Sequence, residues 1–195
     1  MKILNIDIND LKLSQIYLSQ KKIDDVLVWF EPSLQKFEPI HARDFLNNGN
    51  MHITDGHTRT FVAWCHGVKQ IPYIYDVSEI VSCELGQIQY KEDIIWCDRF
   101  NLQNISDLSS RILSEHDYEK LWRGRCEKMY YLKVALLENK INIKEFEENK
   151  TKWKKQDLFL YGMSEDLDMF YLENISGELF EKPYNCSISI DTQGE

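Results

Sequence analysis

The fold of this 195-residue chain is decided by one stretch, Ile53-Thr54-Asp55-Gly56-His57-Thr58-Arg59. The β-forming residues at its start predict the end of a strand. The apolar run over residues 60–66, closed by Gly67, predicts a helix with a left-handed glycine stop. Residues 71–75 predict a second strand. The segment is therefore a β-turn-α-β unit with its polar residues at the turn.

A turn of this kind suits phosphate binding. The first backbone N–H groups of a helix have no partner within the helix and the helix dipole is positive there, so an anion is held before any side chain contributes. Gly56 lets an anion approach the backbone, and Arg59 can contact two of its oxygens. The alternative stays open, because an Asp-Gly pair also marks ordinary turns and an Arg in a first helical turn is usually a solvated surface residue.

Residues around the turn follow a wider pattern, with Glu38-Pro39-Ile40 before it and Ala63, Gly67 and Ile71-Pro72 after it. This pattern resembles the core of the ParB/sulfiredoxin superfamily. The Asp-Gly-His-Thr-Arg order is similar to a ParB-like group that includes the free serine kinases. The resemblance implies an α/β (α+β) fold with a phosphate-binding module over residues 1–80.

The first module is expected to hold strands at 2–8, 37–45 and 50–54, a turn of hairpin type at 47–50, and a helix at 21–30 capped by Ser19. Past residue 75 the apolar spacing changes to longer helices, predicted at 90–100, at 106–113 and from a capping box at 114–117 to about residue 138. Ile94, Ile95 and Cys97 are the expected core positions of the first of these helices. Strands are predicted at 158–161, 169–173 and 178–181, the last two as a hairpin. We therefore expect residues 81–195 to form a helical extension with a C-terminal β hairpin that packs directly on the module.

Two arginines of the extension lie in segments that also agree with the ParB-like group. Arg111 follows Ile105-Ser106-Asp107-Leu108, and Arg125 follows Tyr118-Glu119-Lys120-Leu121-Trp122. An arginine within an apolar segment needs a carboxylate or a ligand if it is buried. We therefore expect Arg111 and Arg125 either to bind substrate or to form structural ion pairs with acidic residues.

The resemblance also constrains the chemistry. In sulfiredoxins the turn carries the catalytic cysteine directly after glycine, and here that residue is His57, so sulfinic-acid repair is not expected. In the free serine kinases the turn holds nucleotide phosphates. By resemblance, Gly56, His57, Thr58 and Arg59 would bind ATP or ADP, with His57 a candidate general acid or phosphate donor. Asp55 would bind Mg²⁺ or orient the acceptor, or it would only accept backbone N–H bonds within the turn.

The serine kinases carry a catalytic glutamate in the loop after the first strand, and the alignment places Gln15 there. Glutamine cannot accept a proton as a general base. Either Asp24 or Asp55 replaces it, or the reaction needs no base, or the protein binds nucleotide without turnover. We expect Gln15 to be held by contacts that a glutamate could also make, so that Gln15→Glu would raise or create phosphate transfer to serine.

Composition argues against several other classes of function. The net charge of −9 disfavours nucleic acid as a partner. No apolar run reaches membrane-spanning length and acidic residues lie near the N-terminus, so we expect a cytoplasmic protein without membrane contact. The five cysteines contain no C-x-x-C pair, which argues against a disulfide framework or a zinc site. The sequence leaves a homodimer open.

The leading hypothesis is a nucleotide-binding, small-molecule phosphotransferase similar to the free serine kinases, with serine as one candidate acceptor. The second is a non-catalytic nucleotide-sensing or protein-interaction module. A DNA-associated ParB-like protein is the third and weakest hypothesis because of the negative charge.

Overall fold

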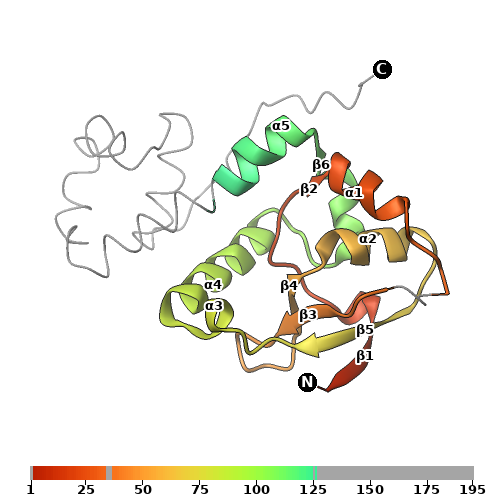
Figure 1. The fold of residues 1–195 in the computed structure, drawn as a ribbon. Helices are drawn as coiled ribbons and strands as arrows, with labels where there is room; N and C mark the ends of the chain where they lie inside the picture. Colours follow the sequence, from red (N-terminus) through yellow and green to blue (C-terminus); the bar gives the residue numbers. More distant parts are fainter. Residues whose placement is uncertain (1, 34–36, 125, 127–195) are drawn as a thin grey trace, which may run out of the picture. The chain divides into compact units, whose positions relative to one another are not determined.

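A computed structural model describes residues 2–33, 37–124 and 126 (Figure 1). By contacts the chain divides into one compact unit over Met1–Trp122 and a second over Arg123–Glu195. The first unit combines helices with a mixed β-sheet, which confirms the expected α/β class. Within the described residues no helix is long and apolar enough to cross a membrane. Arg125 and the strands predicted between 158 and 181 lie outside the described residues.

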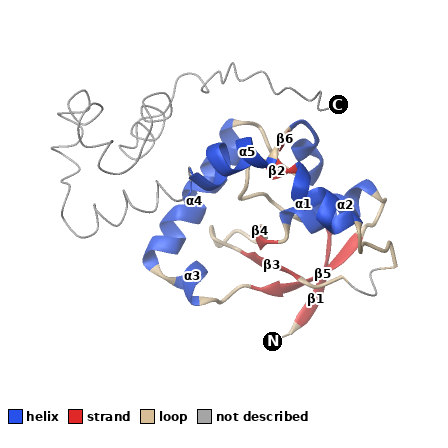
Figure 2. Cartoon of the chain, turned by 45° about the horizontal axis from the view of Figure 1, so that its top comes forward, coloured by secondary structure: helices blue, strands red, loops and turns tan. Residues whose placement is uncertain are grey.

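The four-stranded sheet has the order β1 (Ile3–Asp7), β5 (Gln70–Tyr75), β3 (Ile40–Arg43) and β4 (His52–Asp55). β1 and β5 are antiparallel, β5 and β3 are parallel, and β3 and β4 form an antiparallel hairpin (Figure 2). The hairpin loop contains Asn47 and Gly49 at positive φ, as the predicted turn requires. The order places β3 between the two strands that flank the turn of interest.

Helices α1 (Gln20–Leu27) and α2 (His57–Cys65) pack against each other over the sheet (Figure 2). The Ser19 side chain accepts a hydrogen bond from the Lys22 N–H, so the predicted cap of α1 is confirmed. Gly67 follows α2 with φ of 74°, which confirms the predicted glycine stop. Both helices bury their apolar face, and the core is lined by the buried residues Ile23, Val26, Phe61, Val62, Ala63, Ile40, Ile53 and Ile71.

Downstream of the sheet come α3 (Glu79–Ser82) and α4 (Glu84–Arg99). α4 starts six residues before the predicted position, at a turn in which Cys83 accepts a hydrogen bond from the Gly86 N–H. Ile94 and Cys97 are buried as expected. The prediction for Ile95 is wrong, because its side chain is 45% exposed.

The segment predicted as a helix at 106–113 has a different structure. It forms the 3₁₀ helix η2 (Ile105–Ser110) followed by the short strand β6 (Ile112–Leu113). β6 pairs in parallel with β2 (Leu18–Ser19), so long-range pairing overrides the local helical pattern. After it, Ser114 caps α5 (Glu115–Tyr118) as predicted, and the chain continues as a π-helical segment, η3 (Glu119–Arg123).

Candidate functional site

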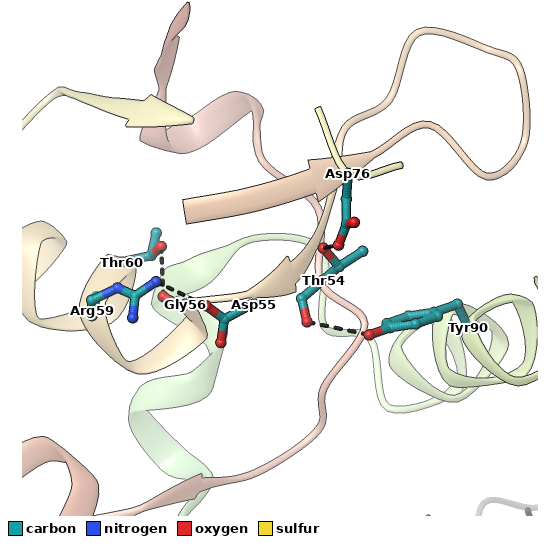
Figure 3. A network of polar contacts seen from close by, with 7 residues as sticks. All are labelled: Thr54, Asp55, Gly56, Arg59, Thr60, Asp76 and Tyr90. Carbon is teal, nitrogen blue, oxygen red and sulfur yellow. Dashed lines mark hydrogen bonds and ion pairs between the residues drawn. The ribbon is translucent and has the colours of Figure 1, made fainter. Parts of the chain in front are cut away.

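The predicted turn joins β4 to α2 through one glycine (Figure 3). Gly56 is the N-cap of α2 and has φ of 105°, a conformation that residues with a Cβ rarely adopt. A Cβ at this position would also lie 2.7 Å from Ile40 Cγ2. The glycine is therefore required both by its backbone conformation and by the close approach of β3.

An open pocket of about 280 Å³ lies at this turn. Its lining combines four separate parts of the chain: the loop after η1 (Ile8–Asp10), helix α1, the turn itself and α5, which contributes Tyr118. The lining residues of this turn pocket are Gln15, Lys22, Asp25, Val26, Asp55, Gly56, His57, Thr58, Arg59 and Tyr118. The structure thus brings Gln15 together with residues 55–59, as the alignment to the serine kinases expects. Sequence reasoning missed Lys22, Asp25 and Tyr118.

Asp55 and Arg59 form an ion pair across the first turn of α2, with 2.9 Å between Asp55 Oδ2 and Arg59 Nη2 (Figure 3). The Asp55 side chain is 65% exposed, whereas the Arg59 side chain is 20% exposed. Exposed ion pairs contribute about 0–1 kcal/mol, so an incoming anion can replace the carboxylate on Arg59 at little cost. Arg59 Nε is buried without a hydrogen-bond partner in the described part of the chain. Among the described residues no backbone N–H donates to the Asp55 side chain, so its carboxylate serves Arg59 and not the turn backbone.

His57 lies beneath the loop that carries Gln15. Its side chain is 5% exposed, and burial lowers the pKa of the imidazole to about 3. Its Nε2 accepts a hydrogen bond from the Ser14 N–H at 3.3 Å, while the Ser14 hydroxyl donates to the carbonyl of Ile53. A buried, neutral ring engaged in this way ties the loop to α2. The arrangement favours this structural role over the predicted role of general acid or phosphate donor.

Gln15 is held by its amide nitrogen, which donates to the carbonyl of Tyr17 and to the hydroxyl of Tyr118. A carbonyl oxygen only accepts hydrogen bonds, so a glutamate could not make the first of these contacts. The expectation that a glutamate would be held by the same contacts is therefore wrong for Tyr17. The Tyr118 hydroxyl could still donate to a carboxylate.

Of the carboxylates that could act as a general base, one lies on the solvent side of α1 and two line the pocket. Asp24, proposed from the sequence, accepts a hydrogen bond from Gln20 on the exposed side of α1 and does not line the pocket. Asp25 does line it and pairs with Lys21 at 2.8 Å. Asp55 and Asp25 are therefore the carboxylates that the described residues bring to the pocket.

Lys22 projects from the first turn of α1 toward Tyr118. Its Nζ lies 3.4 Å from the Tyr118 hydroxyl and 4.8 Å from the ring centroid. No carboxylate pairs with Lys22 within the described residues, in contrast to its neighbour Lys21. The signal in the sequence is weak, because Lys22 simply flanks the apolar face of an amphipathic helix and such lysines are commonly solvated.

Arg111 does not join the turn pocket. Its guanidinium carbon lies 4.3 Å from the Phe100 ring centroid and 5.5 Å from that of Tyr17. It lines a different, polar hollow beside Ser106 and Ser110. The alternatives from the sequence were a ligand or an acidic partner. Instead, the contacts of this guanidinium in the described structure are to two aromatic rings.

The strand end behind the turn is held by a buried carboxylate. Asp76 accepts hydrogen bonds from the Thr54 hydroxyl and the Ser78 N–H, and Tyr90 donates to the carbonyl of Thr54 (Figure 3). Burial alone would raise the pKa of Asp76, but the hydrogen bonds outweigh it and the pKa is lowered. Tyr90 also stacks on Phe45, so α4 contacts the loop between β3 and β4. This network supports the turn without facing the pocket.

The residues present offer limited support for a metal. Among the described residues there is no group of three His, Cys, Asp or Glu side chains that could hold an ion. Mg²⁺ commonly binds one or two carboxylates together with substrate phosphates and water. Asp55 fits that pattern as a single ligand beside bound phosphate.

No protein-family model and no curated protein matches this chain. Among solved structures it is similar to protein Atu1540 from Agrobacterium tumefaciens, with 14% sequence identity and a TM-score of 0.37. The alignment covers 55% of this chain and 61% of that one, so the chain spans less than two thirds of that protein. A likeness at this level supports no conclusion about function.

Proposed function

We propose that this protein binds the phosphates of ATP or ADP in the turn pocket and acts as a small-molecule phosphotransferase similar to the free serine kinases. The observation that carries the proposal is the convergence of Gln15, Lys22 and Arg59 on the N-terminus of α2. These residues come from three parts of the chain, and the pocket they line is polar. The resemblance of residues 55–59 to the turn of the ParB-like group points to the same ligand.

Phosphoryl transfer depends mainly on positioning the reactants and neutralising charge. The backbone N–H groups of His57 and Thr58 lie at the start of α2, where a helix has unpaired donors. Arg59 supplies a charged donor whose present partner is an exposed carboxylate. Asp55 would then be free to hold Mg²⁺ against the phosphates or to orient the acceptor hydroxyl.

Whether the pocket transfers phosphate or only binds nucleotide depends on a base that can take the proton of the acceptor hydroxyl. Gln15 cannot remove a proton from an acceptor hydroxyl, so Asp55 or Asp25 would have to do so. The amide at position 15 is the specific observation that favours the second candidate, a nucleotide-sensing module without turnover. The protein is therefore expected to transfer phosphate to serine slowly or not at all.

The test combines binding with turnover on the full chain. Thermal shift with ATP, ADP and CTP, with and without Mg²⁺, should show stabilisation of about 2.7 kcal/mol at a hundred times the dissociation constant. Release of ADP from ATP, or of AMP from ADP, with a panel of hydroxyl acceptors then separates the phosphotransferase from the sensor. If no phosphate compound shifts the transition, the proposal fails. Binding without turnover for any acceptor would assign the protein to the sensing class.

A further inference from the structure

We infer that the turn pocket selects two linked phosphate groups and does not recognise a nucleobase, with Lys22 as the cation that contacts the second phosphate. This inference rests on the proposed function, because it takes the pocket at α2 as the phosphate site. It goes further by assigning a residue that the sequence did not indicate and by defining the ligand class as a diphosphate, whether inorganic or part of a nucleotide.

The pocket holds a cation that no acidic side chain of the described residues neutralises. Asp55 has Arg59 as its partner, and Asp25 has Lys21, which lies outside the lining. Lys22 is the remaining cation of the lining, and in the described part of the chain its ammonium contacts a phenol and an aromatic ring. When Lys21 is counted with its partner Asp25, three cations face two carboxylates, and Lys22 is the cation that has no acidic partner among the described residues. An anion is the ligand that would complete the pocket.

The positive charge of Lys22 lies on a different element from the first anion site. Arg59 and the α2 N–H groups bind from the turn, whereas Lys22 reaches in from α1. A single phosphate offers its oxygens around one phosphorus atom. Two linked phosphates offer oxygens over a longer span, so a diphosphate can contact Arg59 and Lys22 from two elements at once.

The pocket offers little surface on which a nucleobase could bind. Purine rings in proteins are held by apolar or aromatic side chains, and ligand pockets are mostly lined by such residues. The one aromatic lining residue, Tyr118, is 3% exposed and carries the Lys22 ammonium over its ring. Val26 is the one aliphatic lining residue and is also buried. Neither offers a free face for stacking.

The size of the pocket agrees with this composition. Its volume of about 280 Å³ lies at the lower end of the typical range of roughly 300–1,000 Å³ for drug-sized ligands. The pocket is large enough for two linked phosphates, and the preference for them over a nucleoside rests on its polar lining. A nucleoside attached to the diphosphate would extend out of the open mouth of the pocket.

Calorimetric titration of the full chain with inorganic pyrophosphate, ADP, orthophosphate and adenosine tests the inference, in the presence and absence of Mg²⁺. Pyrophosphate should bind within about threefold of ADP, orthophosphate should bind at least about tenfold more weakly, and adenosine should not bind. Lys22→Met should weaken pyrophosphate about tenfold or more and leave orthophosphate nearly unchanged. Lys22→Arg should retain most of the affinity, because it keeps the charge.

Lys21→Met is the matched control, since Lys21 is the neighbouring lysine on α1 and pairs with Asp25 outside the lining. Because its loss leaves the Asp25 carboxylate unpaired, it should weaken pyrophosphate and orthophosphate to the same small extent, by less than about threefold. Binding of ADP more than about tenfold tighter than pyrophosphate would overturn the inference while leaving the proposed function intact. The same holds if Lys22→Met and Lys21→Met behave alike. If none of the phosphate ligands binds, the proposed function fails as well.

Discussion

Arg59 and Arg111 are two arginines that the sequence marks as candidate ligand contacts, and the structure gives them different surroundings. Arg59 lies at the start of a nine-residue helix, in a pocket, against a carboxylate that is mostly exposed. Arg111 lies before a two-residue strand with its guanidinium carbon over the rings of Phe100 and Tyr17. In the described part of the chain, neither guanidinium pairs with a buried carboxylate.

The difference separates a contact that a ligand can replace from one that it cannot. The carboxylate partner of Arg59 is exposed, and a phosphate offers the guanidinium more oxygens and more charge than that carboxylate does. The rings around Arg111 hold the guanidinium by its faces, and no anion reproduces that contact. A site arginine is therefore identified by a partner that can be exchanged, together with open space beside it.

The largest expected effect concerns the chemistry of the turn pocket. Gln15→Glu places a carboxylate beside the Tyr118 hydroxyl and Lys22, at the cost of the contact with the Tyr17 carbonyl. A positioned general base contributes on the order of 10²–10⁴-fold in rate. Phosphate transfer from ATP or ADP to serine should rise by that order or appear for the first time, in a radiolabelled phosphate assay.

An Arg111→Ala control should leave the activity of the Gln15→Glu protein unchanged, because Arg111 does not line the pocket. Efficient transfer by the wild type would mean that Asp55 or Asp25 already acts as the base. If neither protein phosphorylates serine although both bind nucleotide, serine is not the acceptor and the sensing function becomes the better account.

The next effect concerns the backbone that shapes the turn pocket. Gly56→Ala adds a strained left-handed conformation and a contact of 2.7 Å with Ile40 Cγ2, so we expect a loss of about 2–4 kcal/mol in the free energy of unfolding. Gly67→Ala is the matched control, because Gly67 has φ of 74° and open space around it. It should lose only about 1–2 kcal/mol. Equal losses in urea unfolding would show that the approach of Ile40 does not constrain the turn.

The next prediction is a dependence of the free energy of unfolding on pH, which the buried His57 ring causes. Burial lowers its pKa from 6.5 to about 3, so the unfolded chain binds more protons between these values. The stability from the neutral ring is complete above pH 6.5 and is lost as the pH falls toward 3, by up to about 1.4 kcal/mol for each unit. His57→Gln can still accept the Ser14 N–H and should flatten this dependence, measured by urea unfolding at pH 7, 5 and 4.

His52 also has a pKa lowered by burial and contributes in the same direction, but it is present in both proteins and cancels in the comparison. An identical loss of stability with acid in wild type and His57→Gln would show that the ring is not held neutral by the fold.

The smallest effect belongs to the Arg111 region. Arg111→Ala removes the cation–π contacts with Phe100 and Tyr17, worth about 0.5–2 kcal/mol. Arg111→Lys should recover part of this stability, because an ammonium also interacts with aromatic rings but without the planar stacking. Thermal unfolding checks both variants. No change in either would mean that the ring contacts contribute nothing to the fold.

These differences also show what the sequence could predict. The strand, glycine, helix and glycine stop around residue 56 follow from local rules, because Gly56 and Gly67 have conformations that few other residues adopt. The meeting of Gln15 with the turn was predicted through the family resemblance. Lys22 and Tyr118 could not be placed, since their meeting depends on how α1 and α5 pack. For the same reason β6 was mistaken for helix, because its partner β2 lies more than 90 residues earlier.

Phosphate binding through Arg59 is tested most sharply by the affinity of ADP for two arginine variants. Arg59→Ala should weaken binding by about 1.5–3 kcal/mol, the range for a charge-assisted hydrogen bond, while leaving the melting temperature of the free protein nearly unchanged. Arg111→Ala should show the opposite, with lower stability and unaltered affinity. A contradictory result would be an Arg59→Ala protein that loses stability but binds ADP as tightly as the wild type.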